Sequence, residues 1–128
     1  MEFIIQDALR SQEESNKTTN NVFPVGQANI KVVGVGGGGG NATSWLYKKG
    51  IQGAEVIAVN TDKQHLDIHE ADKKILVGKD LTKGLGAGGY PNVARDAAKE
   101  SITELKEAVK GSDMVFICAG LGGGTGTG

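Results

Sequence analysis

The stretch that decides the fold reads MVFICAGLGGGTGTG and spans residues 114–128. Its first six residues, Met114–Ala119, form an apolar run that predicts a buried strand of a parallel sheet. Five glycines and two threonines fill the last seven positions. Glycine lets the backbone approach a ligand, successive N–H groups can hold an anion, and hydroxyls can donate to phosphate oxygens. Because α/β sheets bind ligands beyond the carboxyl ends of their strands, the stretch predicts a phosphate loop rather than a flexible linker.

Three further apolar runs, each followed by a polar or glycine-rich loop, precede this stretch. They predict strands at residues 30–35, 54–59 and, shorter and nearer an edge, 73–77. The segments between them predict helices at residues 42–49, 63–68 and 91–110. Strands that alternate with helices indicate the α/β fold class, here a Rossmann-like parallel sheet with flanking helices.

Single residues sharpen the helix predictions. Asn41 is expected to cap the first helix, with Trp45 on its inner side as a core residue. Pro91 is expected at the first position of the last helix. The polar triplet Asn60-Thr61-Asp62 has two open interpretations: it hydrogen-bonds a ribose or base, or it caps the short helix that follows.

Composition excludes several classes of protein. The 128 residues suffice for one domain with a core, and 38% apolar and 23% charged residues are ordinary for a globular protein. A net charge of −1 gives no general attraction to nucleic acid or acidic lipid. The single cysteine, Cys118, is expected to be a small core residue in a reducing, cytoplasmic setting. His65 and His69 are expected to be solvent-exposed and not metal ligands.

The first 27 residues differ from the rest of the chain. Apolar residues between Phe3 and Leu9 predict a short amphipathic helix, and the polar run from Ser11 to Asn21 predicts a flexible tether. Residues 28–128 form the predicted domain. Because a helix should follow the last glycine loop in a parallel α/β fold, we expect the chain to be the N-terminal part of a longer protein, truncated after the fourth strand.

Three of the four loops are glycine-rich, and together they predict a site for a nucleotide. A dinucleotide-binding Rossmann domain is one alternative, because residues 34–39 satisfy GxGxxG. This class expects an acidic residue at the end of its second strand, and Asp62, two residues past Asn60, matches that position only approximately. A Walker-type NTPase is excluded, because the chain has no GK[ST] motif.

The four loops, taken together, resemble those of the tubulin and FtsZ family. Residues 122–128 are similar to the family's signature loop, and residues 35–42 to the first nucleotide loop of FtsZ. Residues 60–62 resemble the second loop, and residues 84–88 with Pro91 the third. The order and spacing favour prokaryotic FtsZ over eukaryotic tubulin, and the long N-terminal segment resembles archaeal members. The chain departs from the pattern at Gly89-Tyr90, where Ala-Asn is common, and at Ala94, where Gly is common.

The resemblance implies a GTP-binding domain that takes GTP or GDP with Mg²⁺. By motif position, the α- and β-phosphates and the nucleoside would be approached by Gly37, Gly38, Gly39, Gly40 and Asn41. Asn60 would lie near the ribose or base. The γ-phosphate would be sensed by Ala87, Gly88 and Gly89. The phosphates would be wrapped by Gly123, Gly124, Thr125, Gly126 and Thr127.

The resemblance also implies a GTPase that assembles with itself, head to tail, into the filament of the division ring. An acidic loop of the adjacent subunit would complete hydrolysis, so we expect residues 1–128 alone to be inactive and to fold poorly. Division-site membrane-anchor proteins are the other expected partners, with a cytoplasmic location at the division site, no nucleic acid and no direct membrane insertion. The alternatives are an NAD(P)-binding oxidoreductase domain and a non-polymerising tubulin-like regulator.

Overall fold

The computed structural model describes residue 6 and residues 28–128, so the helix and tether predicted in the first 27 residues lie, residue 6 apart, outside the described residues. The strands and helices have the bounds β1 Ile30–Val35, α2 Gly36–Lys49, β2 Ala54–Asn60, α3 Lys63–Ile68, β3 Lys73–Leu76, α4 Lys79–Thr82, α5 Pro91–Glu100, α6 Ile102–Val109 and β4 Met114–Ala119. Helices separate successive strands along the described chain: one each after β1 and β2, and three between β3 and β4. Among these residues no helix combines the length and the apolar character needed to cross a membrane.

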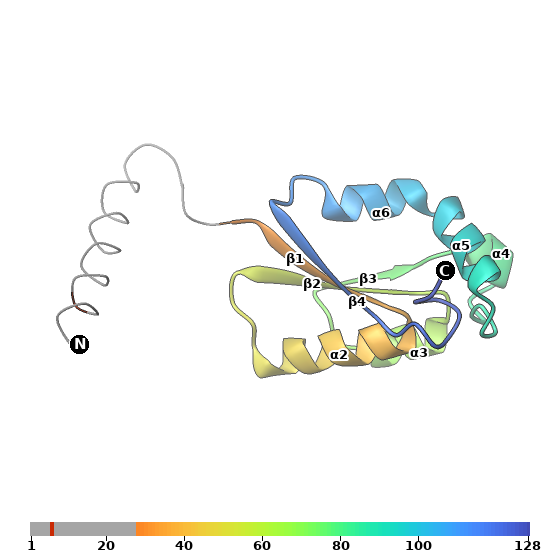
Figure 1. Ribbon diagram of the computed structural model, residues 1–128, viewed down its shortest axis with the longest axis horizontal. Helices are drawn as coiled ribbons and strands as arrows, with labels where there is room; N and C mark the ends of the chain where they lie inside the picture. The colour runs from red at the N-terminus through yellow and green to blue at the C-terminus, as the bar shows by residue number, and fades with distance from the viewer. Residues whose placement is uncertain (1–5, 7–27) are drawn as a thin grey trace.

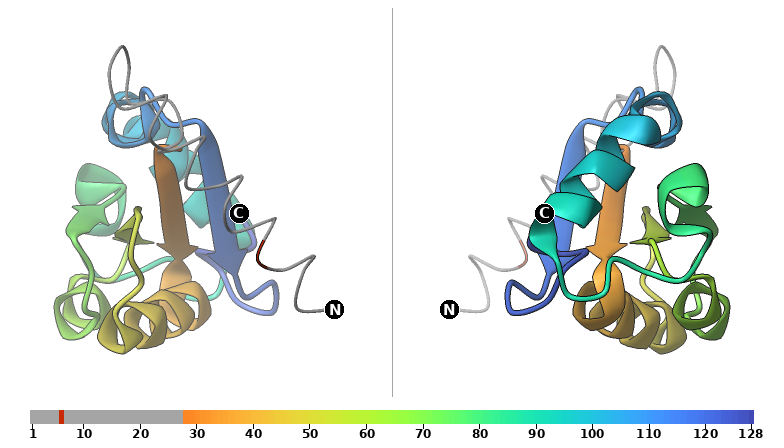
Figure 2. Two further views of the ribbon diagram at one scale, coloured as in Figure 1. Left: turned by 90° about the vertical axis from the view of Figure 1, so that its left-hand side faces the viewer. Right: turned by 90° about the vertical axis from the view of Figure 1, so that its right-hand side faces the viewer.

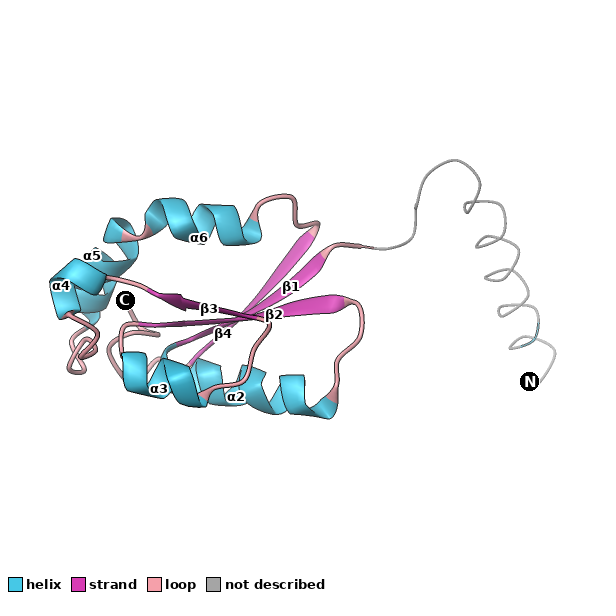
Figure 3. Cartoon of the chain, turned by 180° about the vertical axis from the view of Figure 1, so that it is seen from behind, coloured by secondary structure: helices cyan, strands magenta, loops and turns pink. Residues whose placement is uncertain are grey.

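The four strands form one parallel sheet in the order β3-β2-β1-β4. Helices α2 and α3 lie on one face of the sheet, and α5 and α6 on the other (Figures 1 and 3). The chain moves outward from β1 to β2 and β3, then returns along the opposite face to place β4 beside β1 (Figure 2). The predicted fold class and the edge position of the third strand are confirmed. The reversal beside β1 is a topological switch point, where such sheets bind ligands.

The main core lies between the sheet and the pair α5 and α6. Alternate residues of each strand point to this face, because side chains alternate along a β-strand. Ile57 and Ile75 are almost fully buried there, and burying such a side chain contributes about 1.5–3 kcal/mol. The buried members of the cluster are Val33, Ile57, Val59, Ile75, Val77, Ala97 and Ala108.

Helix α2 packs closely on the opposite face and differs from its prediction. It begins at Gly36, directly after β1, and so includes the whole glycine run. Its buried residues are all small: Gly36, Gly39, Gly40, Thr43 and Ser44. The prediction that Asn41 caps this helix is wrong, because Asn41 lies in the second turn. The prediction that Trp45 is a core residue is also wrong: it is 61% exposed, under the Lys49 ammonium group, because the small residues face the sheet.

Strand β4 lies where predicted, but the prediction that it is buried is wrong. Phe116 is 51% exposed and Ile117 71%, and Cys118, predicted in the core, is half-buried. The reason is position, since β4 is an edge strand with β1 as its neighbour. A cavity of about 390 Å³ also lies between the sheet and α5 and α6, and Val115 and Ile117 line it. The helices on this face therefore do not fill the space over β4.

The helix predicted over residues 91–110 is divided in two. Pro91 stands at the start of α5 as predicted, but the helix breaks at Ser101, whose backbone has φ −102° and ψ 18°. The Ser101 hydroxyl accepts a hydrogen bond of 3.0 Å from the backbone N–H of Gly78. A serine hydroxyl with a tertiary partner favours a local backbone conformation other than a regular helix.

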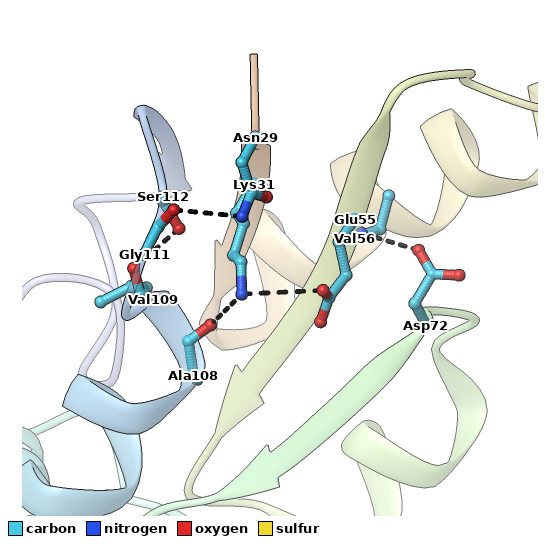
Figure 4. A network of polar contacts seen from close by, with 9 residues as sticks. All are labelled: Asn29, Lys31, Glu55, Val56, Asp72, Ala108, Val109, Gly111 and Ser112. Carbon is cyan, nitrogen blue, oxygen red and sulfur yellow. Dashed lines mark hydrogen bonds and ion pairs between the residues drawn. The ribbon is translucent and has the colours of Figure 1, made fainter. Parts of the chain in front are cut away.

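Polar contacts hold the amino-terminal ends of the strands (Figure 4). Lys31 is 9% exposed; its Nζ donates to the carbonyl of Ala108 at 2.7 Å and lies 3.7 Å from Glu55 Oε2. Ala108 is in the last turn of α6, so the ammonium group also faces the negative end of that helix dipole. Nearby, Asp72 Oδ2 accepts a hydrogen bond of 2.7 Å from the N–H of Val56. These contacts leave the carboxyl-terminal ends free to form the site.

Candidate nucleotide site

Four loops surround one cavity of about 560 Å³ at the carboxyl-terminal ends of the strands. What the sequence predicted as the first loop is the junction of β1 with α2, formed by the first turn of the helix at residues 36–38, and it is still called the first loop. The second loop follows β2, the third precedes α5, and the fourth follows β4. The cavity is lined by Val35, Gly36, Gly37, Gly38, Asn60, Thr61, Asp62, His65, Leu85, Gly86, Ala87, Gly88, Gly89, Gly120, Gly122, Gly123, Gly124, Thr125 and Gly126. Backbone and small polar side chains therefore make up most of its wall.

The start of α2 supplies backbone donors to this cavity. No side chain caps the helix at Val35, and the first turn contains no acidic residue. The first N–H groups of a helix have no partner within it, and the helix dipole adds a partial positive charge at this end. Gly36, with φ 75°, makes the turn from the strand. The geometry is that of an anion site.

Asn60 in the second loop presents a buried donor without a partner. The residue is 2% exposed, and its Oδ1 accepts hydrogen bonds from the backbone N–H groups of Thr61 at 2.8 Å and Asp62 at 3.2 Å. Its Nδ2 has no partner among the described residues. An unpaired buried donor costs about 1–3 kcal/mol, so a ligand that accepts from Nδ2 would remove that cost.

The second and third loops are joined by backbone contacts. Asp62 and Leu85 form an isolated antiparallel bridge, and the N–H of Lys63 donates to the carbonyl of Gly84 at 3.0 Å. Asp62 also caps α3, because its Oδ1 accepts from the N–H of His65 at 3.2 Å. The capping interpretation of the triplet at residues 60–62 is thus confirmed for Asp62, while Asn60 and Thr61 face the cavity.

The fourth loop closes the cavity against the second and the third. The Thr125 hydroxyl lies 2.8 Å from the Thr61 hydroxyl. A Cβ added to Gly124 would stand 3.0 Å from the backbone of Gly89, and one added to Gly126 would stand 2.6 Å from the carbonyl oxygen of Gly120. These close approaches leave no room for a side chain.

Ten of the fourteen residues predicted for the site line the cavity together. Four do not. Gly39 is buried against the Cys118 carbonyl, and Gly40 against the ring of His69. Asn41 points to His69, whose Nε2 lies 3.0 Å from Asn41 Oδ1. The Thr127 hydroxyl turns back within its own loop and donates to the carbonyl of Gly123 at 2.6 Å.

The predicted set omits several residues that line the cavity. Thr61 and Asp62 could have been included from sequence, because they follow the same strand as Asn60. His65 could not, because its place in the lining depends on how α3 returns over the first loop; its Nδ1 would lie 3.7 Å from a Cβ on Gly37. The other omitted residues are Val35, Gly36, Leu85, Gly86, Gly120 and Gly122.

The two histidines differ, and the exposure predicted for His69 is wrong. His65 is exposed, whereas His69 is 6% exposed and packed on α2. Burial, together with the nearby His65 and Lys74, lowers the pKa of His69 below its ordinary value of 6.5. A neutral His69 therefore holds α3 to α2 behind the first loop.

Among the described residues, no three side chains of His, Cys, Asp or Glu come together as a metal site. Asp62 is the carboxylate in the cavity lining. Mg²⁺ is commonly held by one or two carboxylates, waters and substrate phosphates, so Asp62 in a phosphate cavity fits a phosphate-bound Mg²⁺.

Comparison with known families agrees with this geometry. The family model described as Tubulin/FtsZ family, GTPase domain, matches residues 29–128. The chain belongs to the tubulin/FtsZ family. Cell division protein FtsZ 2 of Methanocaldococcus jannaschii is 54% identical over 125 residues, which are 98% of this chain and 32% of that protein. Cell division protein FtsZ 1 of Archaeoglobus fulgidus is 60% identical over 99 residues, 77% of this chain and 27% of that protein. The predicted likeness to archaeal members of the tubulin/FtsZ family is confirmed.

Solved structures of the family have the same fold. An empty FtsZ dimer from M. jannaschii matches with a TM-score of 0.81 and 51% identity, over 93% of this chain and 33% of that one. A GTPγS-bound protofilament of CetZ2 from Haloferax volcanii matches with a TM-score of 0.68 and 30% identity, over 78% of this chain and 33% of that one. The chain thus spans about a third of the length of these relatives in the tubulin/FtsZ family.

Proposed function

We propose that the full-length protein containing this chain is a GTPase that binds GTP with Mg²⁺ and assembles into the filament of the division ring. The family membership supports a GTPase domain. Nucleotide identity, hydrolysis, assembly and location are proposals for the whole protein, of which this chain carries the phosphate-binding part.

The observation that carries the proposal is the meeting of four loops around one cavity. Three of them offer backbone N–H groups, the first at a helix N-terminus without a side-chain cap. The buried Asn60 Nδ2, which has no partner among the described residues, adds a donor at the same edge. A volume of about 560 Å³ lies within the range of about 300–1,000 Å³ found for ligand pockets. Converging donors suit a polyphosphate, which offers many acceptor oxygens.

The proposed residues act by binding and orientation. Gly36, Gly37 and Gly38 would hold phosphates through backbone N–H groups, and Thr125 would donate its hydroxyl to them. Asp62 would order Mg²⁺ and its waters. When bound, the metal ion would neutralise charge on the phosphates. The four predicted residues that do not line the cavity, Gly39, Gly40, Asn41 and Thr127, would support the loops from behind it.

Assembly into filaments is proposed from the relatives. One similar structure is a dimer of FtsZ, and another is a nucleotide-bound protofilament of CetZ2. We propose that an adjacent subunit, stacked head to tail, completes the hydrolytic site. Hydrolysis should then depend on contact between subunits. Division-site membrane-anchor proteins would recruit the filament in the cytoplasm at the division site.

The test is a sedimentation assay on the full-length protein with Mg²⁺ and GTP, GDP or NADH. We expect pelleting with GTP only, and a GTPase rate per molecule that rises with protein concentration. Tight GTP binding without pelleting would refute the proposed filament and favour the alternative of a non-polymerising tubulin-like regulator. Binding of NADH in place of GTP would refute the proposed nucleotide.

A further inference from the structure

Thr61 lies at the centre of the contacts between the loops. It follows β2 directly and is completely buried. Each of its polar groups has a partner, and its N–H donates to Asn60 Oδ1 at 2.8 Å. Its carbonyl accepts from the N–H of Gly86 at 3.2 Å and lies 3.3 Å from the Thr82 hydroxyl. Its own hydroxyl lies 2.8 Å from that of Thr125. One residue thereby connects the second, third and fourth loops.

The burial of this pair decides which hydroxyl donates. A threonine hydroxyl has one proton to donate and can accept in return. Thr61 is fully buried, and among the described residues Thr125 is the partner of its hydroxyl. If Thr125 donated to Thr61, the Thr61 proton would be buried without an acceptor, which is costly. The favoured arrangement is that Thr61 donates and Thr125 accepts, so the Thr125 proton is free to point into the cavity.

We propose that Thr61 is a positioning residue that fixes the Thr125 hydroxyl as a donor directed at the phosphates. This inference rests on the proposed nucleotide function. Thr61 also lines the cavity, but its hydroxyl is paired with that of Thr125; we place its effect on the ligand in Thr125, which is half-buried and lines the same cavity. Donors whose orientation is set before binding lose less freedom when the ligand arrives.

The test is a double-mutant cycle on GTP affinity in the full-length protein, with Thr61→Val, Thr125→Val and both together. Valine keeps the shape of threonine and removes the hydroxyl. We expect Thr61→Val to weaken GTP binding about fivefold, the scale of one hydrogen bond. The double variant should bind no more weakly than Thr125→Val alone, because Thr61 acts through Thr125. Thr61→Ser should restore affinity, and the matched Thr103→Val, on the exposed surface of α6, should leave it unchanged.

Independent losses that multiply in the double variant, or a failure of Thr61→Ser to restore affinity, would overturn the inference. Absence of GTP binding by the folded wild-type protein would instead refute the proposed function. Amide hydrogen exchange without nucleotide tests the pair in that case as well: Thr61→Val should accelerate exchange at Gly124 and Gly126, and unchanged rates would refute the positioning role. If Thr61→Val does not fold, Thr125→Val breaks the pair from the other side and should accelerate exchange in the same loop.

Discussion

The two longest glycine-rich segments, residues 36–40 and 120–128, look alike in sequence and differ in structure. The first is wound into α2, where a Cβ on Gly39 would collide with the Cys118 carbonyl. The second has no regular structure, and a Cβ on Gly122 or Gly123 would meet nothing within 4 Å. Glycine in the first segment lets a helix pack closely on a sheet. In the second segment Gly124 and Gly126 pack closely against other backbone, whereas Gly122 and Gly123 leave the backbone open. One residue type therefore has two physical purposes at one site.

The largest effect that tests this comparison is expected for Gly39→Ala. The new methyl group would meet the backbone carbonyl of Cys118, which cannot rotate away, so α2 would have to move from the sheet. We expect a loss of about 3 kcal/mol in the free energy of unfolding, the upper end for overpacking. Denaturant unfolding of the full-length protein measures it.

Gly38→Ala is the matched control for the stability measurement. Its Cβ would lie 3.6 Å from Gly120 Cα, an ordinary contact. The unfolding free energy should stay the same or rise by about 0.5 kcal/mol, because alanine favours a helix over glycine. Equal losses of unfolding free energy for Gly39→Ala and Gly38→Ala would mean that close packing of α2 on the sheet is not the reason for glycine at residues 36–40.

A smaller effect is expected for Gly37→Ala, and it should appear in binding rather than in stability. Gly37 lines the cavity, and its Cβ would lie 3.7 Å from His65 Nδ1 without a clash. The methyl group would keep a phosphate from its hydrogen-bonding distance to the helix N-terminus. GTP affinity should fall roughly tenfold, about 1.4 kcal/mol, as calorimetry of the full-length protein can show. Unchanged GTP affinity would mean that the first turn of α2 does not contact the phosphates.

Lowering the pH should reduce the stability contributed by packing against residues 36–40, and it should not affect residues 120–128 in this way. The ring of His69 packs against Gly40, and its pKa is lowered by burial, His65 and Lys74. A lowered folded pKa means that the unfolded state takes up protons first. The stability from neutral His69 is therefore complete above pH 6.5 and is lost as the pH falls from 6.5 through the lowered value. Unfolding titrations between about pH 8 and about pH 5 should show this loss, and His69→Asn should reduce the pH dependence. An equal dependence of the unfolding free energy on pH in the wild-type protein and in His69→Asn would contradict this prediction.

The smallest effect is expected for Gly122→Ala. Nothing lies within 4 Å of its Cβ position. The unfolding free energy should change by less than about 0.5 kcal/mol, as at other open surface positions. A loss as large as that of Gly39→Ala would show that Gly122 is also needed for packing, and the contrast between the two positions would fail.

Much of the fold followed from the sequence because strands leave a local signal. Four apolar runs gave four strands, and the loops after them meet at one sheet edge because parallel strands share a direction. The start of α2 was missed, since glycine is a poor helix former and contacts with the sheet overrule that preference. The break at Ser101 was missed for a similar reason, because its partner Gly78 lies 23 residues away.

Burial was less predictable than secondary structure, because it depends on neighbours that are distant in the chain. His69 is buried by α2, and its contact Asn41 lies 28 residues earlier. β4 is as apolar as β2, yet it is exposed because it lies at an edge. Within the site, the glycine loops were found by composition, whereas the partnership of Thr61 with Thr125 spans 64 residues and leaves no local pattern.

The two edge strands of the sheet differ in how readily a further strand could pair with them. At one edge, β3 is four residues long, and both of its first two residues, Lys73 and Lys74, are exposed. Short, lysine-bearing edge strands discourage pairing with another strand. At the other edge, β4 is six residues long and entirely apolar. Within the described residues the sheet is therefore asymmetric: the edge formed by β4 accommodates a further strand more readily than the edge formed by β3.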